Sequence, residues 1–136
     1  MSFVIDSSVA LAWLLPDERG QAADALVDRL ESASPAAPAI WPLEVANALV
    51  TARRRDRIAD RDVDRMLEVL FALPVDVEPA SGGDMLARVV AIARRHGITT
   101  YDAAYVELAK RRGWPLATLD ARLKAACGIE GVATMP

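Results

Sequence analysis

Short apolar runs alternate along the chain with longer segments in which apolar residues recur every three or four positions. The runs at 3–5 and 114–118 have the length of buried strands, and 75–78 alternates apolar and acidic residues as a strand does. The segments between them have the spacing of helices with one buried face. Strands that alternate with helices are typical of a parallel sheet covered on both sides. We therefore expect an α/β fold with a short central parallel sheet flanked by helices.

The first third of the chain predicts a strand and two helices. A turn at Ser7 and Ser8 separates the strand at 3–5 from a buried helix over 9–15, which Pro16 ends. Asp17 is expected to cap the next helix, which runs to about Ser32. The buried face of that helix is predicted to comprise Ala22, Ala23, Leu26, Val27 and Leu30.

The middle of the chain predicts a helical hairpin. A strand ending at 39–41 leads to Pro42 in the first turn of one helix, and Asp60 opens the helix that packs beside it. Pro74 ends this second helix before the strand at 75–78. Its inward positions are predicted to be Val63, Met66, Leu67, Leu70 and Phe71.

The last third predicts three helices and two strands. The spacing of Ser81 and Asp84 is that of a capping box, and Gly97 and Gly113 supply the left-handed turns that end two helices. The strand at 114–118 is followed by a short helix over 120–126 and a last strand over 132–134. The inner face of the helix before Gly113 is predicted to hold Tyr101, Tyr105 and Leu108.

The composition limits the kinds of site that the chain can contain. It has 136 residues, 53% of them hydrophobic, which suits one domain with a buried core. One cysteine, Cys127, and one histidine, His96, exclude an intramolecular disulfide and multi-Cys or multi-His metal centres. Metal ligands would then be carboxylate and amide oxygens, which suit Mg²⁺ or Mn²⁺. We expect Cys127 in the core and His96 at a helix end.

The charge and the apolar runs bear on partners and location. The formal net charge of −3 argues against a uniformly basic surface, so a polyanion must be met by local basic clusters. No stretch approaches the roughly 18 apolar residues of a membrane span, and no basic region precedes the first apolar run. We expect a cytoplasmic protein that does not enter a membrane.

Four carboxylates stand where apolar segments end: Asp6, Glu44, Asp102 and Asp120. Ligands of open α/β sheets bind at the carboxyl ends of the strands, and Asp6 and Asp120 directly follow predicted strands. Asp102 and Glu44 lie at helix starts that can reach the same rim. Unit charges about 4 Å apart repel by about 4 kcal/mol at intermediate dielectric, so four converging carboxylates would need a cation. The pattern predicts a magnesium site.

Helix capping is the competing explanation for these residues. Asp is a favoured N-cap, and Asp6, Asp102 and Asp120 each stand at or near a predicted helix start. Glu44 is poorly explained as a cap, and Asn47 places a second polar group on its helix face. The capping explanation is therefore weaker for the four residues together than for each alone.

Four motifs in order give the chain a family resemblance. They are Val4-Ile5-Asp6-Ser7-Ser8, Pro42-Leu43-Glu44-Val45-Ala46-Asn47-Ala48-Leu49, Tyr101-Asp102-Ala103-Ala104-Tyr105 and Leu116-Ala117-Thr118-Leu119-Asp120. The whole chain resembles a PIN-domain nuclease, and within that family a VapC-type toxin of a toxin–antitoxin pair. The resemblance implies a single PIN domain over 1–136 with a three-layer α/β/α fold.

The resemblance also implies an activity and its residues. It implies a metal-dependent endoribonuclease in which Asp6, Glu44, Asp102 and Asp120 form the acidic quartet that binds Mg²⁺ or Mn²⁺. Asp6 and Asp102 would hold the principal ion, and Glu44 and Asp120 would position the attacking water or recruit a second ion. Ser8, Thr118 and Asn47 match supporting polar positions. A homodimer and a VapB-like antitoxin lying across the site are implied as well.

RNA also needs cations beside an acidic pocket. The densest basic run holds Arg53, Arg54 and Arg55, at the end of the helix that carries Glu44, and the alternative is a solvated helix end. The runs at 94–95 and 110–112 carry the same ambiguity.

Two other functions stay open, namely a non-catalytic PIN-like module that binds RNA or protein, and an aspartate-nucleophile phosphatase using Asp6. The phosphatase is disfavoured because position 8 is Ser where such enzymes usually carry a second aspartate.

Overall fold

Five parallel strands form the centre of the molecule. The computed structural model describes residues 2–18, 20–30, 32–80 and 82–136. The strands pair in the order β3-β2-β1-β4-β5, so β1 lies in the middle of the sheet. They are β1 (Val4–Ile5), β2 (Ala36–Ala37), β3 (Asp76–Val77), β4 (Leu116–Ala117) and β5 (Thr134–Met135), and every pairing is parallel. The predicted short central parallel sheet is confirmed.

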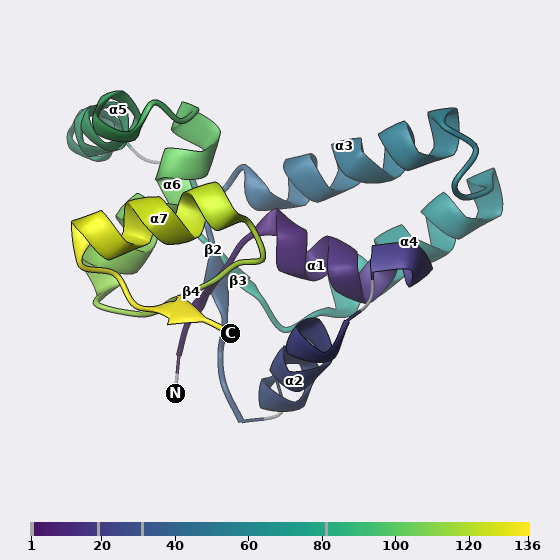
Figure 1. The fold of residues 1–136 in the computed structure, drawn as a ribbon. Helices are drawn as coiled ribbons and strands as arrows, with labels where there is room; N and C mark the ends of the chain where they lie inside the picture. The colour runs from purple at the N-terminus through teal and green to yellow at the C-terminus, as the bar shows by residue number, and fades with distance from the viewer. Residues whose placement is uncertain (1, 19, 31, 81) are drawn as a thin grey trace.

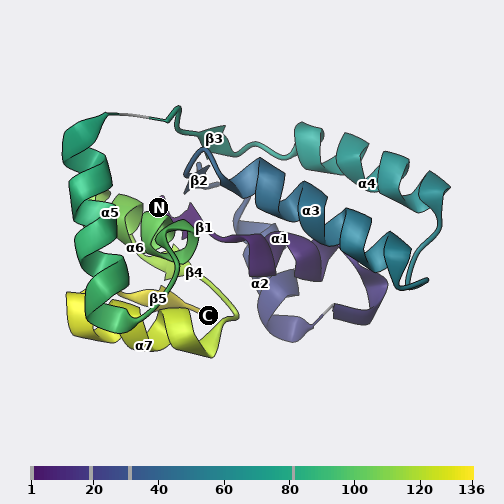
Figure 2. The same cartoon turned by 90° about the horizontal axis from the view of Figure 1, so that it is seen from above.

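Helices cover both faces of this sheet. One side carries α1 (Ser7–Leu14), α2 (Gln21–Arg29), α3 (Trp41–Arg54) and α4 (Asp60–Ala72), with the 3₁₀ turn η1 (Pro16–Glu18) between α1 and α2. The other side carries α5 (Gly83–His96), α6 (Thr100–Arg112) and α7 (Ala121–Glu130). Figures 1 and 2 show the strands between these two groups, which is the three-layer arrangement that we expected. The same views show α3 and α4 as the predicted hairpin, projecting away from the sheet.

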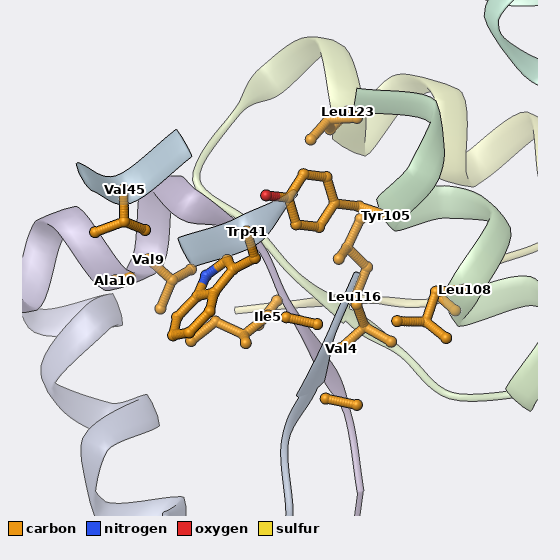
Figure 3. Close-up of a cluster of buried hydrophobic side chains, with 14 of the residues drawn as sticks. Val4, Ile5, Val9, Ala10, Trp41, Val45, Tyr105, Leu108, Leu116 and Leu123 are labelled. Carbon is orange, nitrogen blue, oxygen red and sulfur yellow. The ribbon is translucent and has the colours of Figure 1, made fainter. Parts of the chain in front are cut away.

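The core lies where the two helical layers meet the sheet. In Figure 3, Ile5 and Leu116 of the strands lie in the middle. Trp41 and Val45 of α3 lie on one side of them, and Tyr105 and Leu108 of α6 lie on the other. These side chains are 2% exposed or less. The indole Nε1 of Trp41 donates to the backbone oxygen of Asp6 over 3.2 Å, which ties the start of α3 to the end of β1. The core therefore fixes the strand ends that precede the candidate site.

In the second half of the chain, α5 and α6 end at the glycines predicted to end them. Gly97 and Gly113 have φ of 62° and 67°, the left-handed conformation that glycine adopts without strain, and they end α5 and α6. The side chain of Thr99 accepts a hydrogen bond from the backbone N–H of Asp102 and caps α6. Cys127 is buried, as expected for a core residue.

The strand predicted to end at 39–41 is wrong. Ile40 has helical backbone angles, Trp41 begins α3, and the strand lies at Ala36–Ala37 instead. Pro42 favours a helix start, which draws Trp41 into the helix. The two alanines lack the bulk of typical strand residues, but they occupy a strand that is enclosed by neighbours on both sides, where small side chains suffice.

Three predictions about the second helix are also wrong. Asp17 does not cap α2, because it lies in η1 and pairs with the guanidinium of Arg57 over 2.8 Å. Gly20 takes the N-cap position without a side-chain bond, and the helix ends at Arg29 rather than near Ser32. Val27 is exposed, because Ala23 and Leu26 supply the buried face.

Two residues that were predicted to face inward, Phe71 and Tyr101, are exposed. Phe71 is 78% exposed because α4 buries Met66 and Leu70, and Phe71 falls at the edge of that stripe. Tyr101 is exposed because the first turn of α6 lies at the rim of the molecule, whereas Tyr105 one turn later is buried.

The remaining differences are shifts of a few residues. Helix α1 begins at Ser7 without an intervening turn, α7 extends to Glu130, and the last strand lies at Thr134–Met135. The capping role predicted for Ser81 lies outside the described residues. Within the described ranges, none of the helices is both long and apolar enough to cross a bilayer.

Candidate active site

Two neighbouring strands deliver the first two carboxylates. Strands β1 and β4 pair with Ile5 opposite Ala117, and Asp6 directly follows β1 while Asp120 lies three residues beyond β4. Each residue caps the helix that follows: Asp6 accepts from the backbone N–H of Val9, and Asp120 accepts from those of Arg122 and Leu123. The capping explanation is thus correct for both residues. Capping leaves acceptor capacity on each carboxylate, so it does not exclude a second role.

Asp6 lies at the centre of a hydrogen-bond network. Its side chain accepts from Ser8 Oγ over 2.6 Å and from the hydroxyl of Thr118. Ser8 Oγ in turn accepts from the backbone N–H of Leu119 over 2.9 Å, and Thr118 Oγ1 accepts from that of Asp120 over 3.0 Å. These bonds join the loops after β1 and β4 and hold Asp6, which is only 2% exposed, in one orientation.

Helices α3 and α6 supply the other two carboxylates, each from its first turn. Glu44 accepts a hydrogen bond from the hydroxyl of Tyr105, one turn further along α6 than Asp102. Burial and the negative charge of Glu44 raise the pKa of Tyr105 well above its usual range, so the phenol stays protonated and donates. The contact links the two helices across the carboxyl edge of the sheet.

The four carboxylates influence one another electrostatically. Burial is the largest cause that raises the pKa of Asp6, Glu44 and Asp102, and a neighbouring carboxylate adds to each shift. Glu44 is affected by Asp6 and Asp102, and both of those residues are affected by Asp120. We call these four residues the acidic ring. Ionisation of Asp6, Glu44 and Asp102 is costly because these carboxylates are buried and lie near other carboxylates.

The donor chemistry of the ring fits a hard divalent cation. All candidate ligands are carboxylate oxygens, and three of them, Asp6, Glu44 and Asp102, have pKa values raised by burial and by a neighbouring carboxylate. In the described part of the chain, however, no three His, Cys, Asp or Glu side chains are grouped closely enough to hold a metal ion as they stand. The ring therefore has the composition of a cation site with wider spacing than a closed coordination shell.

The supporting residues take different positions. Ser8 and Thr118 both contact Asp6 directly. Asn47 is exposed one turn after Glu44 on α3. Arg53 is engaged by Asp60 over 2.8 Å and by Asp56 over 3.4 Å, whereas Arg54 and Arg55 are exposed at the end of the same helix.

Two residues near the ring had no assigned role from the sequence. Tyr105 has the spacing of a core residue, and only the fold shows that its hydroxyl reaches Glu44. The charge of Arg122, in the first turn of α7, partly offsets the rise in the pKa of Asp102, and its guanidinium donates to the backbone oxygen of Gly97 over 3.1 Å. A cation just after Asp120 was a visible signal in the sequence, because the first turn of a helix ordinarily favours acidic residues.

Comparisons with known proteins agree with this architecture. A family model described as PIN domain matches residues 3–129. Ribonuclease VapC3 of Pyrobaculum aerophilum is 35% identical over 123 residues, which cover 90% of this chain and 92% of that protein. Ribonuclease VapC9 of Mycobacterium tuberculosis is 36% identical over 121 residues, 88% of this chain and 87% of that protein.

Solved structures give the same result for the fold. The crystal structure of PAE2754 from Pyrobaculum aerophilum superposes with a TM-score of 0.69 at 26% identity, covering 98% of this chain and 83% of that one. VapBC2 from Rickettsia felis, solved with a promoter DNA fragment, superposes with a TM-score of 0.69 over 98% of this chain and 97% of that one. Its identity is 11%, so this likeness concerns the fold alone.

Proposed function

The chain belongs to the PIN-domain family, among relatives named VapC ribonucleases, and from this membership we propose that it is a divalent-metal-dependent endoribonuclease, the toxin of a toxin–antitoxin pair. Its reaction is the hydrolysis of RNA phosphodiester bonds. The relatives cover nearly the whole chain, so the activity is proposed for one PIN domain spanning residues 1–136.

The observation that carries the proposal is the acidic ring. Four carboxylates come from four separate segments, and burial together with a neighbouring carboxylate raises the pKa of Asp6, Glu44 and Asp102. Helix capping accounts for Asp6 and Asp120 singly, but placing ionised carboxylates close together does not stabilise a fold, since each makes its neighbours harder to ionise. A site whose function is to attract a cation explains it, because the cation supplies the missing positive charge.

Asp6 and Asp102 are proposed to hold the ion, which we take to be Mg²⁺, with Mn²⁺ as a substitute. When bound, such an ion supplies charge to the phosphoryl oxygens and an activated water. Ser8 and Thr118 orient the Asp6 carboxylate through their hydroxyl groups. The hydroxyl of Tyr105 donates to Glu44 and fixes its orientation, and the pKa of Glu44 is raised. Both features suit a carboxylate that positions the attacking water. Asp120 completes the ring, and Asn47 is proposed to assist Glu44.

The partners follow from the same family relationship. We propose RNA as the substrate, a VapB-like antitoxin that covers the acidic ring, and a homodimer as the toxin's own assembly. Arg54 and Arg55 remain candidates for RNA contact, and so does Arg53, which is paired with Asp56 and Asp60 but half-exposed. A cytoplasmic location stays a prediction from the sequence.

The test is cleavage of RNA by the purified chain. Total RNA is incubated with the protein in Mg²⁺, Mn²⁺ or EDTA, and the new RNA ends are sequenced. We expect cleavage with either metal and none with EDTA, and loss of cleavage in Asp6→Asn. Asp64→Asn is the matched control, because it removes one exposed carboxylate from α4, far along the chain from the ring. The absence of metal-stimulated cleavage in the unaltered protein would refute the proposed activity.

The antitoxin is tested separately in cells. Expression of the chain alone is expected to arrest growth, and co-expression of the neighbouring gene is expected to relieve the arrest. Growth arrest that persists in Asp6→Asn would show that toxicity does not depend on cleavage.

A further inference from the structure

A hollow of about 460 Å³ lies between α5 and α6. Its charged lining consists of four cations and one carboxylate: Arg88, Arg95, Lys110, Arg111 and Glu107. We call it the α5–α6 groove. The protein as a whole carries a formal charge of −3, so this concentration of cations runs against the average of the molecule.

The arrangement of the groove places its positive charge outward. Arg88 and Arg95 are each 51% exposed and Lys110 is 52% exposed. The carboxylates that hold them are nearly inaccessible, because the side chains of Glu107 and Glu130 are 3% and 4% exposed. An approaching ligand therefore meets ammonium and guanidinium groups first.

Each of these two glutamates holds more than one cation. Glu107 pairs with Arg88 over 3.3 Å and with Arg111 over 2.8 Å. Glu130, at the end of α7, pairs with Arg95 over 3.0 Å and with Lys110 over 2.9 Å, and it also contacts His96. Arg111 also pairs with Glu78 over 2.8 Å, and Glu78 is shared with Arg112 as well. The four groove cations thus share three carboxylates, which leaves an excess of positive charge. It also leaves N–H donors unused, because a guanidinium carries five.

We propose that the α5–α6 groove binds phosphates of the RNA backbone that flank the bond to be cleaved. This inference rests on the proposed function. An acidic ring repels the phosphates on either side of the scissile bond, so an RNA strand needs cations close by. Helix α6 carries both features, since Asp102 lies in its first turn and Lys110 lies eight residues further on. At a rise of about 1.5 Å per residue this separation is about 12 Å along the axis, within reach of phosphates a few nucleotides away.

The preformed geometry favours phosphate as the ligand. Buried carboxylates already hold the arginine and lysine side chains in place, so little side-chain freedom is lost when phosphate binds. An acidic protein segment would find the same charges, and a second copy of the chain would find the same hollow. Both are alternatives that the experiment below separates from RNA.

The test uses a variant that removes two charges without stranding a carboxylate. In Arg88→Gln/Lys110→Gln, Glu107 keeps Arg111 and Glu130 keeps Arg95 and His96. Affinity for a fluorescent single-stranded RNA is measured by anisotropy over a series of salt concentrations, in the Asp6→Asn background to prevent cleavage. We expect roughly three- to tenfold weaker binding, and a salt dependence whose slope is shallower by about 0.7 per lost phosphate contact. In the active protein we expect KM to rise while kcat stays within about twofold.

Two matched variants isolate the cause. Arg61→Gln/Arg65→Gln removes the same charge from the exposed surface of α4 and should leave affinity and slope near those of the parent. Arg88→Lys/Lys110→Arg keeps both charges in the groove and should retain binding. Circular dichroism and a melting curve identify any variant that fails to fold, in which case the single variant Lys110→Gln takes its place.

The outcomes separate this inference from the proposed function. If the unaltered protein cleaves RNA and the double glutamine variant has unchanged KM, affinity and salt slope, the groove proposal is wrong and the activity stands. The groove proposal is equally wrong if the variant changes only self-association or binding to the antitoxin. If no RNA is cleaved under any metal condition, the proposed function fails. The measured affinity and salt slope then still decide whether the groove binds RNA phosphates.

Discussion

Poorly exposed carboxylates occur in two regions of this molecule, and their surroundings are opposite. In the acidic ring, burial together with the neighbouring charge of Asp120 raises the pKa of Asp6, and Asp6 in turn raises that of Glu44. Beside the α5–α6 groove, Glu130 is surrounded by Arg95, Lys110 and His96, which hold its pKa well below its usual range. The same chemical group is therefore costly to ionise in one region and readily ionised in the other.

This contrast separates structural carboxylates from those available for function. Glu130 joins the ends of α5, α6 and α7, so its charge contributes to the fold. The ring carboxylates repel one another, so their ionised forms detract from the stability of the metal-free fold. Neutralising one carboxylate in each region should consequently change stability in opposite directions.

The largest effect is expected for Asp6→Asn. Without the charged oxygen that would hold the ion, RNA cleavage should fall by about a thousandfold or more, since a bound metal contributes several kcal/mol to such reactions. In EDTA the variant should melt at the same temperature as the unaltered protein or higher, because one source of repulsion is gone. Cleavage rates and calorimetric melting curves measure the two effects. An active Asp6→Asn protein would remove Asp6 from the site.

Glu130→Gln is expected to lower the stability of the fold, in contrast to Asp6→Asn. The substitution keeps the shape of the side chain but removes the charge that Arg95 and Lys110 share and that His96 contacts, so we expect a loss of about 1–3 kcal/mol in the free energy of unfolding. Urea denaturation measures it. RNA cleavage at a temperature where the variant is folded should change little. A melting temperature equal to that of the unaltered protein would mean that these ion pairs are too solvated to matter.

The pH dependence of stability should differ in sign between the two regions. Asp6, Glu44 and Asp102 have raised pKa values, so their favourable contribution is present below about pH 4 and is lost as pH rises through their folded pKa values. Glu130 has a lowered pKa, so its contribution is present above about pH 4.5 and is lost as pH falls.

The two variants separate these contributions in melting experiments between pH 4 and pH 7 in EDTA. The advantage of Asp6→Asn over the unaltered protein should grow as pH rises, and the deficit of Glu130→Gln should shrink as pH falls. If both differences stay constant with pH, ionisation is not their cause.

The smallest effect is expected for Tyr105→Phe. The change removes the hydroxyl that donates to Glu44, which should cost about 1 kcal/mol in stability. It should also raise the pKa of Glu44 further, because this hydrogen bond lowers it. We expect a severalfold decrease in kcat with an acidic limb of the pH–rate profile shifted to higher pH. A stability loss without any shift of that limb would show that Tyr105 only packs.

Local sequence patterns were sufficient for four of the five strands and for most helices. Phe3 to Ile5 and the run before Asp120 formed strands because their apolar residues are continuous, and Gly97 and Gly113 ended helices because they accept left-handed angles. The pattern was insufficient where burial depends on distant partners. Ala36 and Ala37 form a strand only because β1 and β3 enclose them, and Phe71 is exposed although its spacing is that of a buried residue.

The charge clusters also depend on partners that are distant in the sequence. The run at 53–57 is conspicuous in the sequence, yet Arg53 and Arg57 pair with Asp56, Asp60 and Asp17, all of which are exposed beside them. The cations of the α5–α6 groove are spread over residues 88–111, and the buried carboxylates beneath them cannot be recognised from the order of residues alone. A basic run in a sequence therefore does not measure the charge that a surface presents.

Attraction of a divalent cation by the acidic ring underlies the activity proposed for this protein. Isothermal titration of Mn²⁺ into the metal-free protein at pH 7, paired with melting curves at each concentration, tests it directly. We predict that Mn²⁺ binds and raises the melting temperature of the unaltered protein, and that Asp6→Asn shows neither effect. Equal binding and stabilisation in both proteins, or none in the unaltered protein, would contradict the claim.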